Sequence, residues 1–147
     1  MNTFRNCLLL TLALLFLIGS TVKYNEDIEK LDWSVLSSVD WVWENNYYQA
    51  IFNEEQKALD GKEMMIEGFM YPLEYTRKHQ NFLVSASPMA NCFFCGPGEA
   101  EAMIYVQTSV PVDYVYDAMT LKGTFRLVND ASMGIIYELK DAQLVRR

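Results

Sequence analysis

The clearest hydrophobic pattern in the chain has a period of two and runs from Lys62 to Pro72. One face of this run carries Met64, Ile66, Gly68 and Met70, and the other carries Met65, Glu67, Phe69 and Tyr71. Both faces are largely apolar, so the pattern predicts a central strand, or a strand covered by another part of the chain. Gly68 in its middle predicts a bulge or bend, as the curved first strand of a small barrel requires, and Pro72 ends the strand.

Further apolar runs of strand length follow at residues 82–86, 101–108, 123–128 and 135–139. The last two flank a turn rich in Asn, Asp, Ser and Gly and predict a hairpin. Residues 113–121 fit either a strand or one capped helical turn, and residues 141–145 close the chain. Five to six short strands with one short helix predict a mainly β fold. We expect a small, partly open Greek-key barrel of the oligonucleotide/oligosaccharide-binding (OB) type, with a small α+β roll as the alternative.

Ahead of the barrel, residues 31–43 form an N-terminal arm that contains all three tryptophans, Trp33, Trp41 and Trp43. Its spacing suits a helical turn at first and a strand afterwards. We expect the arm to pack on the barrel and close its core, and the alternative is an aromatic binding surface. Asn53 followed by two glutamates predicts the N-cap of the short helix, and Gly61 predicts its end.

The N-terminus has the pattern of a targeting segment. Arg5 precedes an uncharged apolar run at residues 7–19, which is shorter than the ~20 residues of a membrane-spanning helix. We therefore expect a signal peptide at residues 1–20, a polar tether at 21–30 and a single OB-like domain at 31–147, located in the periplasm or cell envelope. A retained anchor is the alternative, and only in that case would the chain contact the membrane.

The acidic balance of the chain argues against a nucleic-acid partner. The sequence has 12 basic and 19 acidic residues, a formal net charge of −7. Removal of residues 1–20 takes away only Arg5 and leaves 11 − 19 = −8. A surface of that sign repels phosphate backbones, because it releases no counterions on binding.

The most distinctive motif is Cys92-Phe-Phe-Cys95, followed by Gly96, Pro97 and Gly98. The glycine-proline triplet does not continue a helix, which a thioredoxin-type site needs after its first cysteine. Covalent haem attachment is excluded because Gly96 stands where a histidine is required. In an oxidising compartment the two cysteines form a disulfide or an inert thiol pair; as thiolates they would supply half of a zinc or copper site.

Other candidate ligands are few. His79, the sole histidine, and Glu99 could complete a metal shell with the cysteines, although a solvated turn histidine is the simpler interpretation. Met64, Met65 and Met70 lie at strand spacing, so we expect them to fill the core rather than bind copper. The sequence contains no Gly-x-Ser-x-Gly, phosphate-binding glycine loop or His-Glu-x-x-His motif, and thus no catalytic constellation.

Several of these motifs together resemble an exported bacterial family, domain of unknown function 3299. The likeness rests on Leu59-Asp-Gly-Lys62, Ile66-Glu-Gly-Phe-Met-Tyr-Pro-Leu73, Phe82-Leu-Val and Asn91-Cys-Phe-Phe-Cys-Gly96 with Glu99, and covers residues 33–144. The Cys-Phe-Phe-Cys-Gly loop after the second strand is similar to the bacteroidete-like branch of that family. The resemblance implies a small envelope barrel with an accessory role beside transport or metal handling.

The sequence thus predicts an exported, non-enzymatic binding or accessory module. Its paired-cysteine loop, rimmed by Phe93, Phe94 and Gly96, would bind a metal ion, zinc or copper, or an envelope or transporter protein. Two alternatives stay open: a thiol-disulfide oxidoreductase with Cys92 as nucleophile, and a structural envelope protein in which the cysteines only staple a loop.

Overall fold

The computed structural model describes residues 28–88, 100–130 and 134–146. Within these ranges the chain is mainly β, with two short α-helices and one 3-10 turn. The elements in chain order are α2 (Trp33–Leu36), β1 (Asp40–Glu44), β2 (Tyr47–Ile51), α3 (Glu54–Leu59), β3 (Glu63–Pro72), β4 (Lys78–Ser85), η1 (Ala100–Ala102), β5 (Met103–Asp113), β6 (Met119–Asp130) and β7 (Ile135–Arg146).

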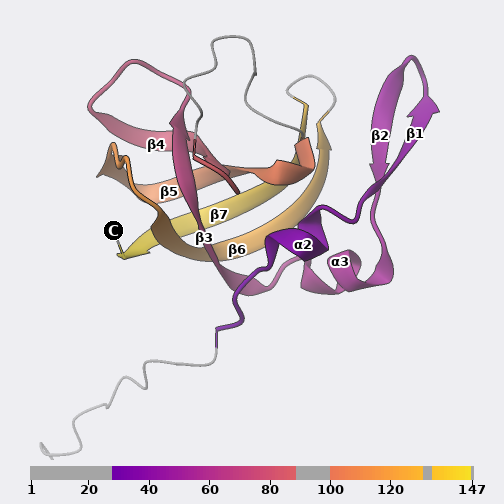
Figure 1. Ribbon diagram of the computed structural model, residues 1–147, viewed down its shortest axis with the longest axis horizontal. Coiled ribbons are helices and arrows are strands. Elements are labelled where there is room, and N and C mark those ends of the chain that lie inside the picture. Colours follow the sequence, from indigo (N-terminus) through magenta and orange to yellow (C-terminus); the bar gives the residue numbers. More distant parts are fainter. Residues whose placement is uncertain (1–27, 89–99, 131–133, 147) are drawn as a thin grey trace, which may run out of the picture.

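Strands β3 to β7 form a closed barrel in the order β3-β4-β5-β7-β6 (Figure 1). Neighbouring strands are antiparallel except for β5 and β7, which pair in parallel. This order, in which the last strand inserts between the third and the fourth, confirms the predicted small Greek-key barrel. The barrel is closed rather than partly open, because β3 pairs with β6 from Glu63 to Gly68.

Residues 113–121, for which the sequence left two interpretations, are strand at both ends and loop between. β5 extends to Asp113 and β6 begins at Met119, so Tyr114 and Tyr116 lie in the connection between them.

Gly68 is the residue at which β3 changes partner. β3 pairs with β6 through Gly68 and with β4 from Phe69 onward. A Cβ atom at Gly68 would lie 2.5 Å from Val84 Cγ1 and 2.6 Å from the Ser85 carbonyl oxygen. The Trp33 ring packs over the same point, and its Nε1 donates a 2.8 Å hydrogen bond to the carbonyl of Glu67. Close packing on both sides therefore requires glycine at this position, where a bulge or bend was predicted.

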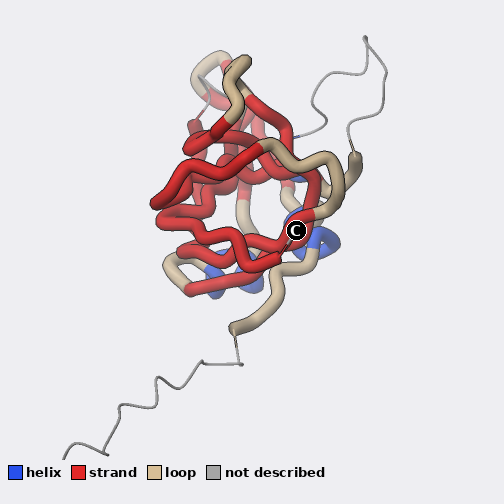
Figure 2. The backbone as a smooth tube through the Cα atoms, turned by 90° about the vertical axis from the view of Figure 1, so that its left-hand side faces the viewer, coloured by secondary structure: helices blue, strands red, loops and turns tan. Residues whose placement is uncertain are grey.

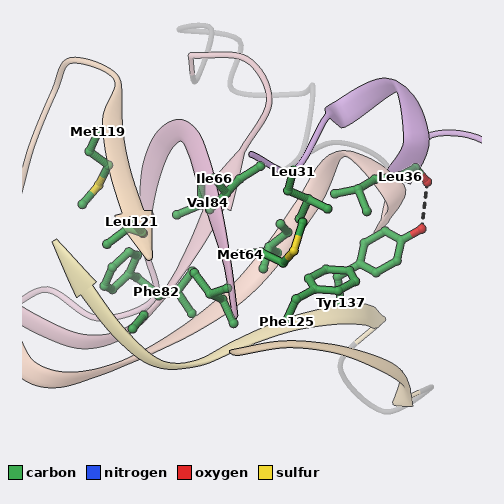
Figure 3. Packing of buried hydrophobic residues seen from close by; sticks show 14 of the residues in the cluster. Leu31, Leu36, Met64, Ile66, Phe82, Val84, Met119, Leu121, Phe125 and Tyr137 are labelled. Atoms are coloured by element: carbon green, nitrogen blue, oxygen red, sulfur yellow. Dashed lines mark hydrogen bonds between the residues drawn. The ribbon is translucent and has the colours of Figure 1, made fainter. Parts of the chain in front are cut away.

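The barrel interior is filled by alternate residues of its strands (Figure 3). Its largest fully buried side chains are Tyr137, Phe82 and Phe125. The predicted role of methionine in the core is confirmed at Met64 and Met70, while Met65 is half-buried on the outer face of β3. Figure 2 shows the strands wrapped around this core.

Helices α2 and α3 are joined to the barrel by a buried polar network. The Tyr137 hydroxyl donates to the Leu36 carbonyl at 2.8 Å, the dashed line in Figure 3. The side chain of Gln56, also fully buried, donates through Nε2 to the Val35 carbonyl at 2.9 Å and accepts from the Asn53 backbone N–H at 3.0 Å. The Asn53 N-cap is thus confirmed, as a complete capping box. Burial raises the pKa of Tyr137 because desolvation disfavours the phenolate, so its hydroxyl stays a hydrogen-bond donor.

Candidate functional site

The N-terminal arm is divided between core and surface. Leu36 is buried and Trp33 and Val39 pack against the core, as predicted for the whole arm. The end of the arm instead pairs with the residues that follow it in a separate two-stranded sheet, β1–β2, which projects from the barrel (Figure 1). The prediction that the complete tryptophan arm closes the core is therefore wrong for Trp41 and Trp43.

The β1–β2 hairpin is built by a two-residue turn. Asn45 and Asn46 have φ angles of 53° and 69°, which are the values of a type I′ turn. The turn sets Trp43 opposite Tyr48 and Trp41 opposite Ala50. Trp43 and Tyr48 contact edge to face, with ring centroids 4.9 Å apart. Asn is favoured here because its side chain tolerates positive φ, so the turn is encoded locally.

Most large side chains of this hairpin are accessible to solvent. The exposed fractions are 39% for Trp41, 38% for Val42, 59% for Trp43, 38% for Tyr47, 65% for Tyr48 and 50% for Ile51. We call this set the aromatic hairpin surface. Single exposed apolar residues are ordinary, but six on one short hairpin, with Trp41, Trp43 and Tyr48 on the same face, are typical of an interaction site.

Side-chain hydrogen bonds hold the hairpin in place against the barrel. The Asn129 amide, at the end of β6, donates to the Ala50 carbonyl at 3.1 Å and accepts from the Ala50 N–H at 3.0 Å. These two hydrogen bonds match those that a neighbouring antiparallel strand would form with the backbone of Ala50. A hollow of about 200 Å³ between hairpin and barrel is lined by Trp41, Tyr48, Asn129 and Ile135, among others. Ala100, the first described residue after the Cys-Phe-Phe-Cys segment, lines the same hollow.

The sequence of the arm and hairpin is rich in carboxylates. Between Lys30 and Lys57 the sequence has five carboxylates and no basic residue; the five are Asp32, Asp40, Glu44, Glu54 and Glu55. The backbone N–H of Ser34 lowers the pKa of Asp32, and the hydrogen bond from Lys57 lowers that of Glu54. Asp40 and Glu44 lie on β1 of the hairpin itself, whereas Glu54 is paired with Lys57 at 2.8 Å, so the charged side chains that the hairpin carries are both carboxylates.

The predicted ligand residues around the paired cysteines lie mostly outside the described residues. Cys92, Cys95, Phe93, Phe94, Gly96 and Glu99 all belong to this undescribed segment. The described residues contain no group of three or more His, Cys, Asp or Glu side chains able to hold a metal ion. In the same part of the chain, no helix is long and apolar enough to cross a membrane. Residues 1–27, which include the predicted signal peptide, are also outside the description.

His79 is placed differently from the expected solvated turn histidine. It is the second residue of β4, pairs with Val112 of β5 and is only 3% exposed. The segment with the cysteines follows the other end of this strand, which at 3.3 Å per residue lies about 20 Å away at Ser85. The interpretation as a solvated residue is therefore wrong.

Comparison with known proteins identifies the family. The model of a family described as "Protein of unknown function (DUF3299)" matches residues 26–145. The chain belongs to the DUF3299 family. Among solved structures, it is similar to a DUF3299 family protein from Pseudomonas aeruginosa PAO1, determined by crystallography at 2.45 Å resolution. The identity is 22%, the match covers 67% of this chain and 68% of the other, and the TM-score is 0.48. Curated proteins gave no match.

In this DUF3299 chain, the sequence indicated an aromatic binding surface only as the alternative to a packed arm, and it did not predict the hairpin that carries this surface. The signal that locates it is Asn45-Asn46, a type I′ pair set between two short aromatic runs. A two-residue loop in that position predicts a hairpin with its own faces rather than a single strand lying on the barrel.

Proposed function

We propose that this DUF3299 chain is an exported, non-enzymatic binding module that docks a partner protein through the aromatic hairpin surface. The observation that carries the proposal is a hairpin with two exposed tryptophans, fixed to the barrel by Asn129 instead of folded onto it. Fixing these side chains before binding reduces the conformational entropy lost on association. Trp and Tyr are also the residues most enriched at the energetic centre of protein interfaces.

The charge around the hairpin specifies the chemistry of the partner. Asp40 and Glu44 lie on β1 itself, and no basic residue occurs between Lys30 and Lys57. A complementary partner presents an apolar patch rimmed by Lys or Arg, because opposite potentials speed encounter and exclude wrong partners. An envelope or transporter protein with such a patch fits; an anionic lipid surface or a nucleic acid does not, since both repel these carboxylates.

The test is affinity capture from an envelope extract, followed by reconstitution with the purified captured protein. We expect Trp43→Ser/Tyr48→Ser to lose binding at least about tenfold, since each residue has the character of an interface hot spot. Binding should weaken as salt rises, because the charge complementarity is screened. The matched control is Tyr75→Ser/Tyr116→Ser, which removes two exposed aromatic rings outside the hairpin.

Three results would overturn this proposal. One is equal binding of the purified partner by the wild type and the hairpin variant. Another is concentration-dependent dimerisation that the hairpin variant abolishes, which would make a second copy the occupant. The third is hairpin-dependent binding to phosphatidylcholine vesicles, which would make the surface a lipid contact.

The role proposed for the paired cysteines rests on the sequence alone. A metal-binding role requires two thiolates at Cys92 and Cys95, whereas a disulfide leaves none to offer. Titration of free thiols in protein from its native compartment, with and without chelator, separates the two. Thiols unmasked only by chelator support zinc or copper binding. No reactive thiols in either condition means a disulfide, and reduction of insulin dependent on Cys92 would replace the binding module by an oxidoreductase.

A further inference from the structure

The β1–β2 hairpin has one open edge. Strand β1 pairs with β2 and with no other described strand, and it lies on the outer side of the hairpin, away from the barrel (Figure 1). All five residues of β1, Asp40–Glu44, are exposed to solvent. The opposite edge is occupied at Ala50 of β2, because the Asn129 side chain bonds both backbone groups of that residue. The free edge of this small sheet is therefore that of β1.

The backbone groups that face the free edge belong to Trp41 and Trp43. In an antiparallel pair, two residues directly opposite each other bond either toward each other or away from each other, and the two kinds alternate along the strand. Ala50 bonds away from β1, to Asn129, so Trp41, which lies opposite Ala50, also directs its N–H and C=O outward. Trp43, two residues along the same strand, does the same. None of these four groups has a hydrogen-bond partner among the described residues.

The side chains of β1 divide into an apolar set and an acidic set. Trp41 and Trp43 share one face of the strand, since successive side chains of a strand alternate. Asp40 and Glu44 lie on the other face, on either side of Val42 and about 13 Å apart along the strand. Neither carboxylate forms an ion pair with another described residue. A segment that lies along β1 therefore meets two indole rings on one face and two carboxylates on the other.

These carboxylates argue against a second copy of the chain at the free edge. If two β1 strands paired antiparallel about a twofold axis at Val42, Asp40 of each copy would lie opposite Glu44 of the other. Like charges directly opposite each other on neighbouring strands are destabilising, and charged residues on edge strands commonly prevent such self-pairing. A different strand with basic residues at these two positions makes both contacts attractive.

We propose that the partner protein docks by adding one extended segment to β1, antiparallel to it. This inference rests on the proposed function and specifies how the partner is held. The segment carries Lys or Arg at two positions four residues apart, opposite Asp40 and Glu44. Its second and fourth residues are apolar and lie against the indole rings. Hydrogen bonds to the backbone of Trp41 and Trp43 supply affinity, and the alternate side chains supply specificity.

The probe for this mode of binding is the peptide acetyl-Lys-Val-Thr-Val-Lys-amide. It is titrated into the isotope-labelled full chain, and the amide signals are followed by nuclear magnetic resonance. We expect a dissociation constant of about 1 mM or tighter. The amide protons of Trp41 and Trp43 should shift downfield because peptide carbonyls become their acceptors, while that of Val42, which faces β2, should change little. Docking through side chains alone would not produce this alternation.

Matched peptides and a charge-reversed chain serve as controls. N-methylation of the second and fourth peptide residues removes the N–H groups that face β1, whereas N-methylation of the third and fifth changes groups that face solvent. The first change should weaken binding at least about tenfold, and the second less than about threefold. The variant Asp40→Lys/Glu44→Lys should bind the lysine peptide about tenfold more weakly and should prefer acetyl-Glu-Val-Thr-Val-Glu-amide.

Strand addition is overturned if about 5 mM peptide leaves the Trp41 and Trp43 amides unshifted, or if the two methylated peptides bind equally. It is also overturned if the charge-reversed chain binds the lysine peptide as the wild type does. Shifts of the same amides when the protein alone is concentrated would make a second copy the occupant, against the proposal.

The proposed function is tested separately, because Trp43→Ser/Tyr48→Ser removes two rings but keeps the backbone edge of β1. Partner capture that depends on these rings, without peptide pairing along β1, would leave docking in place and reject strand addition. Capture that does not depend on the hairpin would instead reject the proposed function.

Discussion

The buried side chain of Gln56 gives the sharpest test of how the helices are joined to the barrel. We consider the change Gln56→Met, which keeps the length and approximate volume of the side chain but removes its amide. The backbone N–H of residue 56 still donates to Asn53 Oδ1, and Tyr137 still donates to the Leu36 carbonyl. Only the side-chain bonds of Gln56 are lost.

The expected loss follows from these bonds. Two are short, from Nε2 to the Val35 carbonyl at 2.9 Å and from the Asn53 N–H to Oε1 at 3.0 Å. At about 1 kcal/mol each, plus about 1 kcal/mol for leaving a buried carbonyl without its donor, the free energy of unfolding should fall by about 3 kcal/mol. The midpoint of thermal unfolding should fall by about 8–16 °C.

Urea unfolding followed by tryptophan fluorescence measures this loss, provided that the m-value is unchanged. The control is Gln143→Met, the same substitution at an exposed position of β7, which should change stability by less than about 0.5 kcal/mol. A loss below about 1 kcal/mol for Gln56→Met, or one equal to the control, would show that the network does not hold α2 and α3 to the barrel.

Three further predictions test the close packing at Gly68, the hydrogen bonds between Asn129 and Ala50, and the loss of stability at acid pH. Gly68→Ala should cost about 1–3 kcal/mol or more, since its Cβ would meet Val84 and the Ser85 carbonyl within 2.6 Å, and urea unfolding would show it. Asn129→Ala should expose the Ala50 backbone and raise amide exchange in β2 while the exchange of β3 to β7 stays unchanged. The hydrogen bond from Lys30 lowers the pKa of Glu67 below 4.5 in the folded state, so the unfolded state binds more protons and stability falls as pH drops below about 4.5. Glu67→Gln should make the fall with pH shallower, as measured by thermal unfolding across that range.

Features encoded by neighbouring residues could be predicted from the sequence. The hydrophobic period of two predicts strand β3, and the capping-box spacing of Asn53 and Gln56 predicts the start of α3. A special role for Gly68 was also predictable, because glycine in the middle of an apolar strand often marks a close approach of another segment. Barrel closure was not, since the pairing of Glu63 with Thr124 joins residues far apart in sequence and depends on accumulated twist.

The candidate sites were harder to predict because exposure is decided by tertiary structure. Large apolar residues such as Trp41 and Trp43 are usually packed against a core. These two lie at the surface because the hairpin that carries them projects from the barrel. His79 stands in a polar run that reads as a turn, yet pairing with Val112 buries it. Tyr75 and Tyr114 come from two separate connections, and nothing local in the sequence indicates that they line one pocket.

Because the barrel is closed, we expect binding surfaces on the hairpin outside it and on the turns that join its strands. Closure pairs β3 with β6 and leaves no free barrel edge among the described strands, so a partner cannot add a strand to the main sheet. The barrel interior is filled by Phe82, Phe125 and Tyr137, which excludes a ligand there. Binding is thus expected at the β1–β2 hairpin, which is outside the barrel sheet, and at the turns that join the barrel strands. The proposed docking surface lies on the hairpin, and variation there changes what is bound without disturbing the core that holds it.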